Sequence, residues 1–190
     1  MEENILKGFL EGADLLRDFA AKSSGKVASA AIAISDAFKI GQKLLVFGNG
    51  GSASQSQHFA GELVGRFLKD RDGFPAIALS TDTSILTSVG NDYGFEEVFA
   101  RQIKALGKKG DVALAISTSG NSPNVIKALQ AAREIGMLTI GLTGGDGGKM
   151  KALLDHHINV PSGSTPRVQE VHLAILHQIS KVIEENLVTK

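Results

Sequence analysis

The chain of 190 residues contains no cysteine, which excludes disulfide bonds, thiol redox chemistry and thiolate metal sites. It also lacks an excess of either charge, because 20 lysine and arginine residues balance 20 aspartate and glutamate residues. With no net field to attract nucleic acid or anionic lipid, local groups must hold any anionic ligand. No apolar run approaches the roughly 20 residues that a membrane helix needs. We therefore expect neither a nucleic-acid partner nor a membrane partner.

The first residues, MEENILKGFLEG, lack the features of a secretory signal, since they are acidic and amphipathic rather than basic and then apolar. Together with the absence of cysteine, this predicts a cytoplasmic protein. Internal repeats and linkers rich in proline, glycine or serine are missing too. We expect a single domain over 1–190, with a helical extension over 1–40 and a core over 41–190.

Helical periodicity fills the extension and predicts two helices, over 2–21 and 26–40. Apolar residues of the first helix form a wide stripe, which comprises Ile5, Leu6, Phe9, Leu10, Ala13, Leu15, Leu16, Phe19 and Ala20. A stripe of this width fits packing on the chain's own core and equally fits a contact between subunits.

Short apolar runs alternate with helix-length segments after residue 42. The runs that predict strands are KLLVF 43–47, PAIALS 75–80, DVALAIS 111–117, MLTIGL 137–142 and HHINV 156–160. Continuous apolar strands separated by helices are typical of a parallel sheet covered on both faces. The predicted fold class is α/β, a doubly wound five-stranded parallel sheet of the flavodoxin-like type. In such sheets ligands bind beyond the carboxyl ends of the strands.

The first predicted strand runs into a glycine-rich turn, GNGGSASQSQHF at 48–59. Ser52 and Gln55 have the spacing of a capping box for the following helix. The glycines would leave backbone amides open to an anion or a sugar. A tight turn that needs positive φ, without any ligand, is the alternative.

The same turn also fits the G-x-G-x-x-A form of a dinucleotide fingerprint. Two helices precede the strand, however, and Asp82 lies further downstream than the usual roughly 20 residues. A lysine followed by serine or threonine, as in a P-loop, is missing. A dinucleotide-dependent oxidoreductase is therefore the weakest of the functional alternatives.

The third predicted strand leads into STSGNSPNV at 117–125, where hydroxyl groups crowd one loop. Ser122-Pro123 has the pattern of a cap and first helical residue. A turn that merely caps its helix is the alternative. Four hydroxyls in six positions exceed what a cap needs, and the pattern favours a phosphate monoester at the helix N-terminus. The four residues are Ser117, Thr118, Ser119 and Ser122.

Two further loops carry weaker signals. In GNDYGF at 90–95, Asn91 and Asp92 could bind sugar hydroxyls, although this pair is also common in ordinary turns. TGGDGGKM at 143–150 predicts a flexible left-handed turn with little reason to expect a ligand contact.

His58 and Glu62 are four residues apart in the helix after the first loop, so they share one face. An ordinary helix pair is the alternative. Gly61 and Gly65 cost about 1 kcal/mol each relative to alanine in a helix interior. They indicate that a backbone or a ligand packs closely there.

The final helix, about 165–187, is apolar around most of its circumference, which predicts burial. Gln169, His172 and His177 interrupt this surface. We interpret His172 as a core histidine that bonds a carbonyl.

Taken together, several motifs resemble the phosphoheptose isomerase family of the sugar isomerase (SIS) domain group. They run in order over nearly the whole chain: GNGGSASQSQHFAGELVGRF, VGNDYGF, GDVALAISTSGNSPNVIKAL, LTGGDGGKM and RVQEVHLAILH. The resemblance implies the fold predicted above, usually as a homotetramer with active sites between subunits. It also implies conversion of sedoheptulose 7-phosphate into D-glycero-D-manno-heptose 7-phosphate, the first step towards activated heptose for bacterial cell-surface glycans such as lipopolysaccharide.

The resemblance also implies roles for individual residues. Glu62 matches the general base and His177 the general acid. The residues that the resemblance implies for substrate binding are Asn49, Gly50, Gly51, Glu62, Asn91, Asp92, Ser117, Thr118, Ser119, Ser122 and Gln169. One zinc ion per subunit is expected on His58, Glu62, Gln169 and His177.

Aldose–ketose chemistry fits these residue types, because a proton moves between adjacent carbons through an enediol and needs one base and one acid. Gln169 and His177, however, are separated by roughly 12 Å of helical rise, which demands long reach for one shared metal. Pro166 departs from the acidic residue of some relatives. The main alternative is a non-catalytic SIS-domain protein that binds a phosphosugar or associates with a replication initiator. Such proteins lack the paired carboxylate and imidazole.

Overall fold

The computed structural model describes residues 1–188, so the last two residues of the predicted domain, 189 and 190, lie outside the described part. Five parallel strands form one sheet in the order β2-β1-β3-β4-β5. This is the strand order of a flavodoxin-like doubly wound sheet, which confirms the predicted fold class. The strands are β1 (Leu44–Gly48), β2 (Ala76–Ala78), β3 (Val112–Ser117), β4 (Leu138–Gly144) and β5 (His156–Val160).

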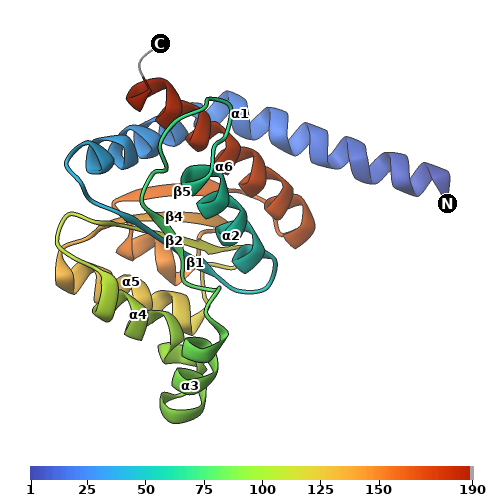
Figure 1. The fold of residues 1–190 in the computed structure, drawn as a ribbon. Helices are drawn as coiled ribbons and strands as arrows, with labels where there is room; N and C mark the ends of the chain where they lie inside the picture. Colours follow the sequence, from blue (N-terminus) through green and yellow to red (C-terminus); the bar gives the residue numbers. More distant parts are fainter. Residues whose placement is uncertain (189–190) are drawn as a thin grey trace.

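Helices cover both faces of the sheet (Figure 1). One face carries α1 (Glu2–Lys39), α2 (Gly51–Val64) and α6 (Thr165–Leu187). The other carries α4 (Val98–Leu106) and α5 (Pro123–Ile135). Beyond this second layer lies α3 (Thr83–Tyr93), none of whose side chains is buried within residues 1–188. Two short 3₁₀ helices complete the fold, η1 (Phe95–Glu97) and η2 (Lys149–Leu153).

The strands are apolar throughout because each of their two faces meets a helical layer. Leu44 and Val46 of β1 enter the cluster formed with α1, α2 and α6, whereas Leu45 and Phe47 enter the cluster on the opposite side. All four side chains are fully buried. Each such burial stabilises the fold by about 1.5–3 kcal/mol.

α1 is one continuous helix, so the prediction of two helices over 2–21 and 26–40 is wrong. The polar segment 22–25 does not interrupt it, and the Ser24 hydroxyl donates to the carbonyl of Ala20 (2.5 Å) within the helix. Phe19 and Val27 are buried on either side of this segment and hold both halves against the same layer. This packing outweighs the roughly 1 kcal/mol that Gly25 costs.

The five strands and the final helix begin and end within two residues of their predicted limits. β2 spans three residues instead of the predicted 75–80 and lies at the edge of the sheet. Pro75 has no N–H to donate to a neighbouring strand, so the ladder begins only after it. Among residues 1–188, no helix combines the length and apolarity required to cross a membrane.

Candidate functional site

The loops after β1 and β3 lie side by side, because these two strands are neighbours in the sheet. Asn49 and Asn124 join them through two reciprocal amide hydrogen bonds, each of 2.9 Å. Asn124 is buried and Asn49 is partly buried. The side chain of Asn49 therefore ties the two loops together.

The predicted capping box at the start of α2 is wrong. Gly50 occupies the N-cap with φ 54°, a left-handed conformation that suits glycine, and the helix begins at Gly51. Ser52 is consequently a buried residue of the first turn, and the side chain of Gln55 donates instead to the carbonyl of Gln169 (2.7 Å). A methyl group added at Gly51 would lie 2.5 Å from the side-chain nitrogen of Gln169. The glycine turn and Gln169 of α6 are thus in close proximity.

In the hydroxyl loop after β3, the side-chain oxygens of Ser117 and Ser122 lie 3.1 Å apart. Ser122 is at the N-cap of α5 and Pro123 follows at its first turn, as predicted. The Ser122 side chain makes no capping bond within the described residues, so its hydroxyl points to Ser117 instead. Ser119 is exposed, and its oxygen accepts the backbone N–H of Asn121 (3.2 Å).

Thr118 and Ser119 line a cavity of about 210 Å³ at this edge of the sheet. The remaining lining residues come from the end of β4 and the loop after it, from the loop before α6 and from the start of α6. They are Gly144, Gly145, Asp146, Ser162, Gly163, Thr165 and Val168. The sequence did not predict that these residues line a cavity. The glycine-rich loop 143–150 does adopt left-handed φ at Gly145, Gly147 and Gly148, but it also borders the cavity.

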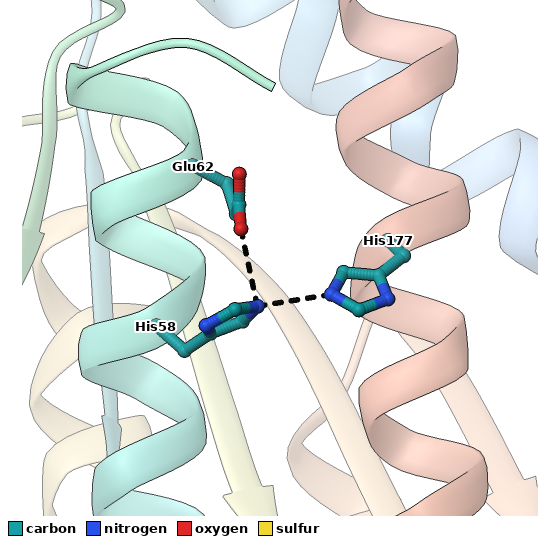
Figure 2. Close-up of side chains that lie close together, drawn as sticks. All are labelled: His58, Glu62 and His177. Carbon is teal, nitrogen blue, oxygen red and sulfur yellow. Dashed lines mark hydrogen bonds and ion pairs between the residues drawn. The ribbon is translucent and has the colours of Figure 1, made fainter. Parts of the chain in front are cut away.

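Titratable side chains from α2 and α6 meet at one point (Figure 2). The Nε2 atoms of His58 and His177 lie 2.9 Å apart, and Oε1 of Glu62 lies 3.2 Å from Nε2 of His58. One potential ligand atom from each residue lies within 4.8 Å of the other two. His58 is exposed, while Glu62 and His177 are half-buried. The structure therefore brings together residues that are 119 positions apart in the sequence.

This donor set fits a divalent metal ion. Two imidazole nitrogens and one carboxylate oxygen are a common ligand set of catalytic zinc sites, which leave a further position for water or substrate. Gln169 contacts Gly51, about two helical turns before His58, which is roughly 10 Å of rise along α2. The structure thus associates Gln169 with the glycine turn, whereas His58, Glu62 and His177 form the compact group.

His172 is a core residue, as predicted. It is fully buried, and its Nε2 donates to the carbonyl of Thr143 (3.1 Å). Burial lowers the pKa of His172 to about 4, although the bond to Thr143 acts in the opposite direction. Its Nδ1 has no hydrogen-bond partner among residues 1–188. A neutral imidazole of this kind has a structural role.

The predicted loop around Asn91 and Asp92 is in fact the last turn of α3, which ends at Gly94 with φ 93°. Both side chains are exposed, and Asn91 donates to Asp92 (2.8 Å). Figure 1 shows α3 and α6 on opposite sides of the sheet. Asp82 caps the start of α3 by accepting the N–H of Ile85 (3.0 Å), and the helix continues through the segment that was predicted as a loop.

The two glycines of α2 differ from their predicted role. Gly65 is the C-cap rather than an interior residue. For Gly61, no atom of the described chain lies within 4 Å of the position that a methyl group would take. Apart from its own helix, the described chain leaves the space beside Gly61 open.

Comparison with known proteins identifies the chain. The SIS domain family matches residues 9–144. A phosphoheptose isomerase of Trichlorobacter lovleyi is 53% identical over 187 residues, which cover 98% of this chain and 95% of that protein. A phosphoheptose isomerase of Geobacter sulfurreducens is 50% identical over the same length, covering 98% and 99%.

Solved structures agree with the sequence relatives. The phosphoheptose isomerase GmhA from Neisseria gonorrhoeae superposes with a TM-score of 0.92 at 42% identity, covering 97% of this chain and 98% of that one. A phosphoheptose isomerase from Francisella tularensis gives a TM-score of 0.94 at 36% identity, covering 96% and 97%. A Vibrio vulnificus NanR protein complexed with ManNAc-6P shares only the fold, with a TM-score of 0.67 at 17% identity. This chain belongs to the phosphoheptose isomerase family of SIS-domain proteins.

Proposed function

We propose that the protein is an aldose–ketose isomerase that converts sedoheptulose 7-phosphate into D-glycero-D-manno-heptose 7-phosphate, at the start of activated heptose biosynthesis. The observation that carries this proposal is the convergence of Glu62 and His177 from two helices on one point (Figure 2). The relatives named phosphoheptose isomerase share about half of their residues with this chain over nearly their full length. A non-catalytic SIS-domain protein is not favoured, because the paired carboxylate and imidazole are present.

In the proposed reaction Glu62 is the base and His177 the acid. Glu62 removes a proton from carbon 1 of the ketose while His177 protonates the oxygen on carbon 2, which gives an enediol. Return of the proton to carbon 2, with loss of the proton from the oxygen on carbon 1, gives the aldose. A positioned base and a positioned acid each typically accelerate such a step by about 10²–10⁴-fold.

The hydroxyl loop is proposed to bind the phosphate group. Ser117, Thr118, Ser119 and Ser122 surround the N-terminus of α5, where hydroxyls, backbone amides and the helix dipole all favour an anion. Asn49, Gly50, Gly51 and Gln169 would bind the sugar, since the turn and the amide are already in contact. Asn91 and Asp92 would contribute their exposed polar groups.

One zinc ion per subunit is proposed to bind His58, Glu62 and His177. Gln169 would be a further ligand only if its side chain left the glycine turn. A bound zinc ion would polarise a substrate oxygen and so stabilise negative charge. A carboxylate that binds the metal through both oxygens is a poorer base. The reaction therefore needs one Glu62 oxygen free of the metal.

A homo-oligomer, with four subunits as in the family, is proposed to complete the site. Two observations support this. The first part of the apolar stripe of α1 is exposed, with Phe9 71% and Ile5 57% accessible, whereas Phe19 further along is buried. α3, which carries Asn91 and Asp92, has no buried side chain within residues 1–188. If a second copy covered α3, Asn91 and Asp92 of the first copy would lie at the site of the second.

A cytoplasmic location is proposed from the absence of cysteine.

The test follows sedoheptulose 7-phosphate by NMR in D₂O, with and without a chelator. We expect the wild-type protein to form the aldose and to incorporate deuterium at carbon 2. Glu62→Gln and His177→Gln should each abolish turnover while keeping the circular dichroism spectrum. The chelator should lower wild-type activity, and zinc should restore it. Near-normal turnover by either variant would refute the assigned roles, and full activity without metal would refute the role of zinc.

A further inference from the structure

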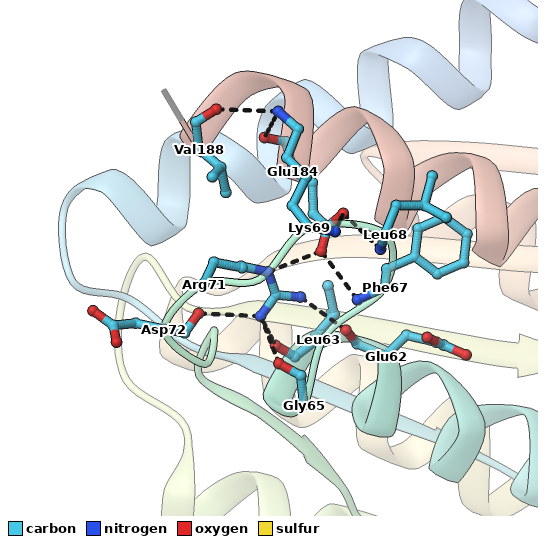
Figure 3. A network of polar contacts seen from close by, with 10 residues as sticks. All are labelled: Glu62, Leu63, Gly65, Phe67, Leu68, Lys69, Arg71, Asp72, Glu184 and Val188. Atoms are coloured by element: carbon cyan, nitrogen blue, oxygen red, sulfur yellow. Dashed lines mark hydrogen bonds and ion pairs between the residues drawn. The ribbon is translucent and has the colours of Figure 1, made fainter. Parts of the chain in front are cut away.

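A second polar network lies next to the candidate site (Figure 3). At its centre is Glu184 of α6, which is 1% exposed. Its carboxylate accepts the consecutive backbone N–H groups of Phe67, Leu68 and Lys69 at 2.9–3.0 Å, and the Nε–H of Arg71 at 3.0 Å. Burial would raise the pKa of Glu184, but these donors outweigh it and lower the pKa. Glu184 is therefore a buried anion with a full set of donors.

Arg71 connects this anion to the end of α2. Its guanidinium donates to the carbonyls of Glu62 and Leu63 at 2.8 Å and of Gly65 at 3.0 Å. The last four carbonyls of a helix have no partner within that helix, so the final turn needs such external donors. A cation there also interacts favourably with the helix dipole. Since the side chains of Arg71 and Glu184 are only 4% and 2% exposed, solvent cannot readily replace either of them.

The network reaches the candidate site through two residues. Glu62 lies in the last turn of α2, and Arg71 holds its carbonyl. Phe67 is held through its N–H by Glu184, and its ring stacks on His177 with centroids 5.7 Å apart and an interplanar angle of 25°. His177 and Glu184 are seven residues apart on α6, which places them on one face about two turns apart.

We propose that Arg71 and Glu184, with Phe67 as the contact, form a positioning network that orients Glu62 and His177. The inference rests on the proposed function, because it assumes that Glu62 and His177 act in the reaction. The network fixes the end of α2 to α6, so that the base on one helix and the acid on the other keep their separation. Arg71, Glu184 and Phe67 are thus positioning residues rather than catalytic ones.

Phe67→Leu and Glu184→Gln test the proposal, with Val64→Ala as control, since Val64 is a 54% exposed residue of the same segment. Phe67→Leu leaves the Glu184 bonds intact, so it decides the question even where Glu184→Gln unfolds the protein. The apo forms are titrated with Co²⁺ and followed by visible absorption, and kcat and KM are measured below the melting temperature. Loss of a supporting contact should weaken Co²⁺ affinity and lower kcat by about 10–100-fold. KM should stay unchanged, as should every value for Val64→Ala.

Wild-type Co²⁺ affinity and kcat in Phe67→Leu would overturn the proposal. So would a Glu184→Gln protein with a lower melting temperature but wild-type kcat and affinity, because the network would then serve folding alone. Failure of the proposed function gives a different result, namely activity in Glu62→Gln or His177→Gln.

Discussion

At the scale of single residues, Ser119 tests the proposed phosphate loop. Its oxygen already accepts an N–H from within the loop, so its hydroxyl proton is free to donate to an anion. Ser119→Ala should raise KM for the phosphosugar by roughly tenfold or more, because a hydrogen bond to a charged group contributes about 1.5–3 kcal/mol. Steady-state kinetics measure this. Ser29→Ala on α1 is the control, and equal KM values in both variants would count against this loop.

His172 predicts a pH dependence of stability. Its pKa is about 4 in the folded state and about 6.5 when unfolded, so the unfolded chain binds a proton first as the pH falls. The contribution of His172 is complete above pH 6.5 and is lost between pH 6.5 and 4. It amounts to about 3 kcal/mol. Urea denaturation of the wild type and of His172→Gln should show a smaller loss of unfolding free energy in the variant over this range. Identical pH slopes would refute the burial argument.

The residue types of the site could be predicted from the sequence, but their proximity could not. The spacing of His58 and Glu62 places them on one helical face. Nothing in local spacing brings His177 to them, because that contact depends on how α2 and α6 cross. The resemblance to a family supplied it. The charged residues of the segment 66–72 gave no signal at all, since surface loops often carry such charges.

At the scale of the elements, substitution of a glycine by alanine tests how closely neighbouring elements approach at that position. A methyl group at Gly48 would lie 2.6 Å from the carbonyl oxygen of Ile116 on the neighbouring strand. Gly48→Ala should therefore destabilise the protein by about 1–3 kcal/mol. Gly61→Ala meets open space in a helix and should stabilise it by about 1 kcal/mol. Chemical denaturation of both variants measures whether their free energies of unfolding change in opposite directions. Destabilisation by Gly61→Ala would show that a ligand or a second copy packs there.

The types of the elements were predictable because, in most segments, the spacing of the apolar residues and the length of the segment indicate the same element. β5 and α6 match their predicted limits. The errors have two causes, which are a tertiary contact that overrides a local signal and local capping residues that were assigned wrongly or overlooked. Packing carries α1 through a polar segment, and a left-handed glycine starts α2 in place of the predicted serine cap. The predicted loop at Asn91 became helical because Asp82 caps α3 by accepting the N–H of Ile85 (3.0 Å).

At the scale of the whole molecule, the exposed first part of the apolar stripe of α1 predicts association. Isolated proteins rarely expose large contiguous apolar patches, so a second copy should cover Phe9 and its neighbours. Phe9→Glu should lower the molar mass measured by sedimentation equilibrium, whereas Lys22→Glu on the exposed side of the same helix should not. A wild-type mass near 19.9 kDa, that of one chain, would contradict the prediction.

The domain organisation stays a prediction at this scale. Packing of α1 along α6, together with the shared core cluster, favours one unit in which residues 1–40 extend from the sheet. The composition indicates no domain boundary within the chain. The structure of residues 1–188 does not contradict this.

The packing of α1 against α6 has a consequence for synthesis on the ribosome. α1 is synthesised before α6, against which it packs. Until α6 has emerged, the apolar surface of α1 that faces it must stay in water or bind a chaperone. His177 also lies on α6, so the group of His58, Glu62 and His177 can form only after this helix has been made.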